Sequence, residues 1–189
     1  MTTSTCTTGY IAFNAISNTN SISKLYKANF NGTDVTLLST TILPKSPIAW
    51  SPDGNSLAFI SLDSELCVVE VKTIKQNCFN NKLRVYDFSW SFDGQSLAYS
   101  ASELNSPVNP IYTSIYIRAL SSGESRKVTG SRDLARRSPR WSKDNQKLVF
   151  AAEGSEQELG VFLLDLSSSK EYRLTAPDYR NYAPEWQPS

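Results

Sequence analysis

Four tryptophans recur along the chain at an interval close to the length of one structural repeat. They are Trp50, Trp90, Trp141 and Trp186, separated by 40, 51 and 45 residues. The first three open similar segments, which read WSPDGNSLAF at 50–59, WSFDGQSLAY at 90–99 and WSKDNQKLVF at 141–150. Self-similarity at a period of roughly 20 to 50 residues is typical of repeat architectures. The repeat therefore constrains the fold more than any other feature of the sequence.

Each copy continues through further segments of the kind that form β-strands. An alternating segment recurs as LYKANF at 25–30, LCVVEV at 66–71, IYIRAL at 115–120 and VFLLDL at 161–166. Turn residues separate such segments every 8 to 12 residues or so, and no apolar period is helical. Four strands in each repeat of about 40 to 45 residues are typical of a propeller blade. The sequence predicts an all-β fold, a β-propeller of four-stranded antiparallel blades with four repeats.

The turn that recurs after the first three tryptophans has a physical reason within the repeat. In Ser51-Pro52-Asp53-Gly54, Pro presets φ, Asp bonds to nearby backbone and Gly supplies a positive φ. Asn145 replaces the Gly at 141–150, and Asn tolerates the same conformation. We interpret these positions, and the Trp that wedges between adjacent sheets, as packing and turn geometry.

The two ends of the repeat array complement each other. GYIAF at 9–13 continues a copy that has no preceding Trp, whereas the last Trp opens WQPS at 186–189 with no strands after it. We expect residues 1–8 to be a tail and 9–189 a single domain, closed when the last Trp strand completes the first blade. Two alternatives remain: two chains form one eight-bladed ring by exchanging end strands, or the sequence is part of a longer chain.

At this point the repeat resembles that of the TolB-like propellers, relatives of the WD-type repeat. The residues that carry the resemblance are WSPDGNSLAFIS at 50–61, LYKANFNGTDVTLLST at 25–40 and YRLTAPDYRNYAPEW at 172–186. It covers residues 9 to 188 and implies a binding scaffold or an accessory domain of a larger protein. Phe92 and Lys143 depart from the pattern by replacing the turn Pro. Asn181 and Arg136 stand where the family often has Asp, so we expect no role tied to that Asp.

The composition excludes several kinds of catalysis. The chain has no His, so a Ser-His-Asp or Cys-His nucleophile system cannot be built. Three Cys without His cannot make an ordinary four-ligand zinc site, and no DxDxDG calcium loop is present. We therefore expect no metal, no cofactor and no catalytic residue. A net charge of +1 gives no field towards nucleic acid or anionic lipid, and no apolar run is long enough to cross a bilayer.

Arg and Tyr residues gather where the chain enters the predicted inner strands, which line the central channel of a propeller. Six of the nine Arg fall there, and both residue types are enriched at binding hot spots, where the Arg fork suits carboxylates. We call the following candidate ligand-binding residues the Arg/Tyr rim: Arg84, Tyr86, Arg136, Arg137, Arg140, Tyr179, Arg180 and Tyr182. We expect an anionic or acidic-peptide ligand over this rim. The alternative is that the Arg side chains pair with local acids.

The leading functional hypothesis is a noncatalytic scaffold that binds a protein or peptide, as a monomer or a strand-exchanged dimer. A second hypothesis is an accessory or gating domain of a larger enzyme. A third is a hydrolase that uses paired carboxylates, for which Asp87 and Glu185 are the candidates. No pair of acids has a motif-like setting, so we expect no enzyme activity.

Two of the three cysteines lie on successive predicted strands. If Lys72 and Thr73 form a two-residue turn, Cys67 faces Cys78, and such neighbours can be bonded in favourable geometry. A disulfide and two half-buried thiols both fit the sequence. A disulfide would favour an extracytoplasmic location, periplasmic or at the cell surface, although the first residues do not read as a signal peptide. Cys6 has no evident partner.

Overall fold

The computed structural model describes residues 9–18, 22–79, 82–103, 112–129, 134–154, 160–176 and 183–187. In these ranges all the regular structure is β: there are fifteen strands and no helix. The strands form four antiparallel sheets, three with four strands and one with three, each hydrogen-bonded in chain order. The all-β class and the division into four repeats are thus confirmed.

Each sheet is one blade. Blade 1 contains β1 (Tyr10–Ile16), β2 (Ser23–Asn29) and β3 (Thr36–Ser39). Blade 2 contains β4 (Ile48–Trp50), β5 (Ser56–Ile60), β6 (Leu66–Glu70) and β7 (Lys75–Phe79). Blade 3 contains β8 (Leu83–Trp90), β9 (Ser96–Glu103), β10 (Ser114–Ala119) and β11 (Ser125–Lys127). Blade 4 contains β12 (Leu134–Trp141), β13 (Lys147–Gly154), β14 (Gly160–Asp165) and β15 (Lys170–Arg173).

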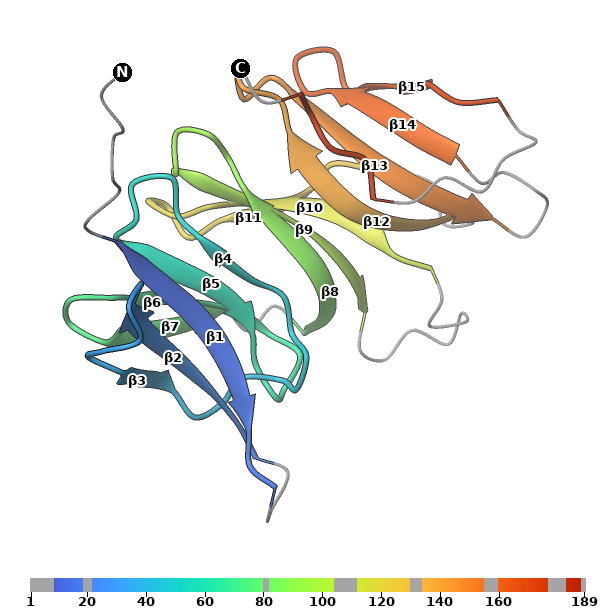
Figure 1. The fold of residues 1–189 in the computed structure, drawn as a ribbon. Coiled ribbons are helices and arrows are strands. Elements are labelled where there is room, and N and C mark those ends of the chain that lie inside the picture. Colours follow the sequence, from blue (N-terminus) through green and yellow to red (C-terminus); the bar gives the residue numbers. More distant parts are fainter. Residues whose placement is uncertain are drawn as a thin grey trace, which may run out of the picture.

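The blades lie side by side along an arc, with blade 1 at one end and blade 4 at the other (Figure 1). Both faces of the middle blades are buried, because alternate residues of one strand pack against opposite neighbours. In β5, Leu57 and Phe59 pack against blade 1, whereas Ala58 and Ile60 pack against blade 3. A third cluster joins blades 3 and 4 through residues such as Ile115 and Phe150. Apolar burial between sheets therefore sets the order of the blades.

The turn after each Trp has the same hydrogen bonds in blades 2, 3 and 4. Ser51 Oγ donates to Asp53 Oδ1 over 2.5 Å, and Asp53 Oδ1 accepts the Asn55 backbone N–H over 3.0 Å. These bonds, that of Ser51 first, lower the pKa of Asp53 to about 2. Gly54 follows with a φ of +70°. The turn residues are thus structural, as their sequence indicates.

The corresponding turns of blades 3 and 4 repeat these distances. Ser91 Oγ donates to Asp93 Oδ1 over 2.6 Å, and Ser142 Oγ donates to Asp144 Oδ1 over 2.5 Å. Asn145 has a φ of +57°, the conformation expected where it replaces Gly.

Each inner-strand Trp after the first is also bonded to the preceding blade. Trp90 Nε1 donates to the Ala49 backbone oxygen over 3.1 Å, and Trp141 Nε1 donates to that of Ser89 over 3.3 Å. Both acceptors are the residue just before the Trp of the neighbouring blade. The tryptophans therefore occupy equivalent places around the arc, as the repeat predicts.

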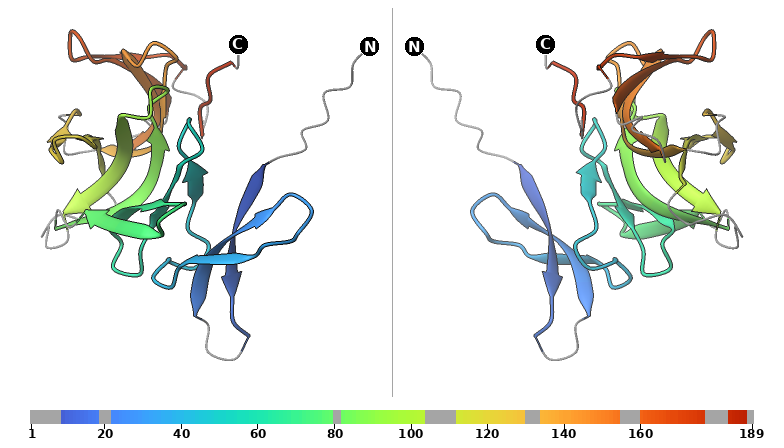
Figure 2. Two further views of the ribbon diagram at one scale, coloured as in Figure 1. Left: turned by 90° about the vertical axis from the view of Figure 1, so that its left-hand side faces the viewer. Right: turned by 90° about the vertical axis from the view of Figure 1, so that its right-hand side faces the viewer.

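The described C-terminal segment and β1 are not paired with each other. Blade 1 has three strands, in the order β1-β2-β3. The C-terminal segment, residues 183–187, lies next to blade 4, where Trp186 Nε1 donates to the Arg140 backbone oxygen over 3.1 Å. Figures 1 and 2 place this segment and β1 at opposite ends of the arc. The expected pairing of the C-terminal segment with β1 is therefore not seen among the described residues.

Candidate functional site

Five residues of the Arg/Tyr rim lie on two adjacent inner strands. Arg84 and Tyr86 are on β8, and Arg136, Arg137 and Arg140 are on β12. The adjacency of the strands follows from the equivalent placement of their tryptophans, since Trp141 is bonded to the residue before Trp90. The three remaining rim residues, Tyr179, Arg180 and Tyr182, lie outside the described residues.

Arg140 on β12 links β8 and the C-terminal segment. Its Nε lies 3.2 Å from Glu185 Oε2 in the C-terminal segment, and its Nη1 lies 3.7 Å from Asp87 Oδ2 on β8. Nη1 also donates to the Pro139 backbone oxygen over 2.8 Å. The guanidinium thus bridges the two carboxylates that we considered as a hydrolytic pair. Its charge is used within the protein, as the alternative interpretation of the rim expects for this residue.

Arg136 is buried between blades 3 and 4. Its side chain is 2% exposed and its Nη2 lies 3.1 Å from Glu171 Oε2 on β15. The guanidinium also lies over the Phe150 ring, 5.9 Å from its centroid. Burial and pairing together give Arg136 a structural place.

The sequence contained a signal for this burial. Ala152 lies opposite Arg136 in the sheet and Gly160 lies opposite Ala152. Two small residues in one row across the blade leave room for a long side chain. The corresponding row of blade 3 has Val85 opposite Ala101, so in blade 4 a charged residue takes an apolar position.

Arg84 and Arg137 differ from these two arginines. Both are exposed, and within the described part of the chain neither is paired with a carboxylate. Tyr86 is half-buried, and its hydroxyl is 3.1 Å from Ser102 Oγ. The described part of the rim therefore contains two arginines bound to protein acids and two that present their charge to solvent.

A cleft lies between blades 3 and 4, at the ends of the inner strands that carry the tryptophans. Its volume is about 410 Å³, and its lining includes Asp93, Arg126, Trp141 and Asn145. Asn145 Oδ1 accepts the Phe92 backbone N–H over 2.7 Å, so the two turns that border the cleft are joined. Sequence reasoning did not identify this cleft, because it depends on how neighbouring turns meet.

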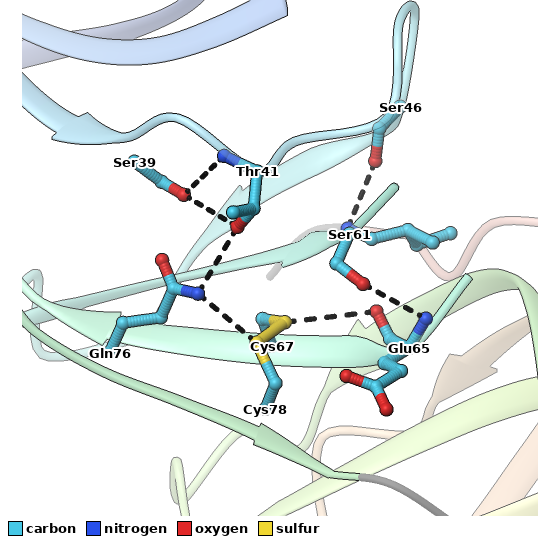
Figure 3. The surroundings of a disulfide bond; sticks show 9 residues. Ser39, Thr41, Ser46, Ser61, Glu65, Cys67, Gln76 and Cys78 are labelled. Carbon is cyan, nitrogen blue, oxygen red and sulfur yellow. Dashed lines mark hydrogen bonds between the residues drawn. A yellow bond between two sulfur atoms is a disulfide. The ribbon is translucent and has the colours of Figure 1, made fainter. Parts of the chain in front are cut away.

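The cysteines of blade 2 form a disulfide. Cys67 lies opposite Cys78 in the β6–β7 ladder, and the two are bonded with a Cα–Cα distance of 4.0 Å. Gln76 Nε2 donates to Thr41 Oγ1 over 3.2 Å beside the bond (Figure 3). Glu65 completes the one cluster of potential metal donors among the described residues, but both sulfurs are used in the disulfide.

The disulfide replaces an aromatic contact of the other blades. Stacked ring pairs occur in blades 1, 3 and 4, namely Phe13–Tyr26 between β1 and β2, Tyr99–Tyr116 between β9 and β10, and Phe150–Phe162 between β13 and β14. In blade 2 the equivalent pair is Phe59 and Cys67. The third-strand aromatic is thus absent from this blade, and a covalent bond between its third and fourth strands stands in its place.

Comparison with known proteins gives similarity at the level of structure. The sequence matches no protein-family model, and no curated protein matches it. TolB from Acinetobacter baumannii superposes with a TM-score of 0.69 at 20% identity, over 92% of this chain and 43% of that one. TolB from Agrobacterium tumefaciens gives 0.67 at 18%, over 87% and 60%. The tricorn protease gives 0.65 at 12%, over 83% and 17%.

These likenesses concern the fold, and the chain spans about half the length of the TolB structures that it matches. In the ranges that the structure describes, no helix has the length and apolar character of a membrane span. The repeated Trp turns, the four successive antiparallel sheets and the superpositions agree. The chain has the TolB-like β-propeller fold.

Proposed function

We propose that this chain is a noncatalytic binding domain that takes an acidic segment of a protein partner on the Arg/Tyr rim. The observation that supports this most is a contrast among the four arginines on β8 and β12. Arg136 and Arg140 are bound to protein carboxylates, whereas Arg84 and Arg137 are exposed without one among the described residues. An exposed guanidinium keeps its fork of donors available for a carboxylate of a ligand.

Tyr86 adds an amphipathic surface next to these charges. Tyr and Arg are the residue types that contribute most to protein recognition when they lie together. Tyr179, Arg180 and Tyr182 belong to the proposed contact set through their place in the sequence, a few residues before the C-terminal segment. The paired Arg140 would position the surrounding strands, since it links β8, β12 and that segment.

An accessory role in a larger enzyme is the second candidate. It is favoured by the superposition on a protease, of which this chain matches only 17%. A carboxylate hydrolase has less support, because Arg140 bridges Asp87 and Glu185. The two main candidates share the same rim, which in the accessory role would contact the substrate or the catalytic domain.

We also propose an extracytoplasmic location, in the periplasm or at the cell surface. The Cys67–Cys78 disulfide supports it, because such bonds persist in oxidising compartments and are rare in the cytosol.

A comparison of peptide classes tests the proposed ligand. Fluorescent peptides of equal length and aromatic content, with Glu, Gln or Lys at alternate positions, would be titrated with the 189-residue protein in low and high salt. We expect the Glu peptide to bind most tightly and to weaken as salt rises, because exposed charges are screened. Equal affinity for the three peptides would refute an acidic ligand. Turnover of peptide, ester or glycoside substrates by the same protein would refute the noncatalytic assignment.

A further inference from the structure

The C-terminal segment shares a backbone feature with the inner strand β12. Ala183 has a φ of +48° and precedes Pro184, and Ser138 has a φ of +52° and precedes Pro139. Both pairs stand at the same distance before a Trp. A positive φ at a residue other than Gly is uncommon, so its recurrence at equivalent positions marks a shared backbone shape. The indole of Trp186 also makes the bond that is expected of an inner strand, to Arg140 of blade 4.

Blade 1 lacks the strand that this segment resembles. In blades 2, 3 and 4 the second strand carries a Leu opposite the inner-strand Trp, and Leu57, Leu97 and Leu148 are each 0% exposed. Ile11 holds that position in β1 and is 48% exposed. An unpaired edge with exposed apolar residues is a template for another strand.

The series of indole bonds is incomplete at the same place. Trp90, Trp141 and Trp186 each donate to the residue before the Trp of the preceding blade. Trp50 follows blade 1, where no Trp strand precedes it, and it has no such acceptor among the described residues. In the other three bonds the acceptor is the residue just before a Trp. For Trp50 the corresponding acceptor would be the backbone oxygen of Glu185, the residue just before Trp186.

We propose that the C-terminal segment of a second copy pairs with β1 and becomes the inner strand of blade 1. By analogy with the other blades, Trp186 of that copy lies opposite Ile11, and its Glu185 lies opposite Ala12. Trp50 then donates to the oxygen of this Glu185. The exchange is reciprocal, so both copies lose their unpaired edges.

The repeat count limits the number of copies in a ring made of this 189-residue chain alone. Closed propellers have roughly four to eight blades, and each such chain contributes four, so that ring contains one copy or two. One copy would have to bring the ends of its own arc together, yet the segment and β1 lie far apart (Figure 2). The rotation between blades is held by the buried clusters. A second copy therefore fits better, and this assembly does not depend on which ligand the rim takes.

Cross-linking between two proteins that each carry one introduced cysteine, in addition to the Cys67–Cys78 disulfide, tests the proposal. In a background where Cys6→Ser removes the unpaired thiol, one protein would carry Ala12→Cys and the other Glu185→Cys. After the two are unfolded and refolded together in equal amounts, a bond between these positions can form only between copies. We expect a covalent dimer on a non-reducing gel in the mixture and much less in either protein alone. A mixture that stays monomeric after oxidation would refute the proposal.

A variant that carries both Ala12→Cys and Glu185→Cys in one chain distinguishes strand exchange from closure of the chain on itself. Exchange predicts a dimer linked twice, whereas a linked monomer would mean that the chain closes on itself and would overturn the proposal. The mass of the unmodified protein in solution, from light scattering, should be that of two chains. Ile11→Asp should shift it to one chain, while Ile74→Asp, at a residue of similar exposure (45%) in the β6–β7 turn of blade 2, should leave the dimer intact.

Discussion

Trp186 Nε1 donates a hydrogen bond to the Arg140 backbone oxygen over 3.1 Å, and this bond extends a series that begins at blade 2. Trp141 and Trp90 make the same bond to the preceding blade over 3.3 and 3.1 Å. The indole thus serves two purposes: its rings cover the second strand of its own blade, and its N–H ties two blades together. These two contributions can be measured separately.

Trp141→Phe should separate them. The ring remains large and apolar, but the donor to Ser89 is lost, so we expect unfolding in urea to require about 1 kcal/mol less than in the wild type. Trp141→Ala also removes the packing against Leu148 and should cost about 3 to 5 kcal/mol. Equal losses for the two variants would show that the indole bond, and not the packing, supplies the stability.

Removing one partner of the buried Arg136–Glu171 pair should lower the free energy of unfolding more than replacing both partners. Glu171→Gln removes the charge that faces a guanidinium 2% exposed, and we expect a loss of about 2 kcal/mol, moderated because Glu171 is partly exposed. Arg136→Met with Glu171→Gln should lose less than Glu171→Gln alone, since no buried charge then lacks its partner. Chemical denaturation of the four proteins in this cycle measures the coupling.

The Ser-Asp turns should make stability depend on acid. The pKa of Asp53 is lowered from 3.8 to about 2, chiefly by the hydrogen bond from Ser51, and that of Asp144 is lowered by the bond from Ser142. A lowered pKa in the folded state stabilises the protein above about pH 4, and the benefit is lost as the pH falls towards 2. In the variant with both Asp53→Asn and Asp144→Asn, the melting temperature should depend less steeply on pH between about 4 and 2. An unchanged slope would contradict the assignment.

Removal of the disulfide should destabilise blade 2 without changing the fold. The bond closes a loop between residues 11 apart, and Cys67→Ala with Cys78→Ala should cost about 2 to 3 kcal/mol. The wild type in reductant should lose a similar amount, while the double variant should not respond to reductant. The measurement is the denaturation midpoint of the wild type and of the double variant, each with and without reductant.

Local geometry was predictable from the sequence where it depends on a few adjacent residues. The turns at 51–54 and 91–94 require a positive φ at a fixed place, and Gly54 and Gly94 supply it. Period-two alternation between turn signals predicted strands such as β6 and β10, because successive side chains of a strand point to opposite faces of its sheet. The fourfold Trp spacing then predicted equivalent blades, as the indole bonds confirm.

The fate of the charged side chains was not predictable in the same way. Arg136 and Arg137 are neighbours in the chain, but the first is buried against Glu171 and the second is exposed. The partner of Arg136 comes from β15, which only the finished sheet brings near. The closure of the ring is likewise undetermined by local sequence, because it depends on the rotation summed over all the blades. The disulfide stayed an open alternative since Lys72-Thr73 is not a favoured tight turn.

The proposal that the rim binds through its two exposed arginines is tested most directly by exchanging their charge. Arg84→Glu with Arg137→Glu would be compared with Arg126→Glu and Lys127→Glu, which make the same change of charge at exposed positions of β11. Fluorescence anisotropy with the Glu peptide should show at least a tenfold loss of affinity for the rim variant and little change for the control. Equal affinities for the two variants would contradict the account.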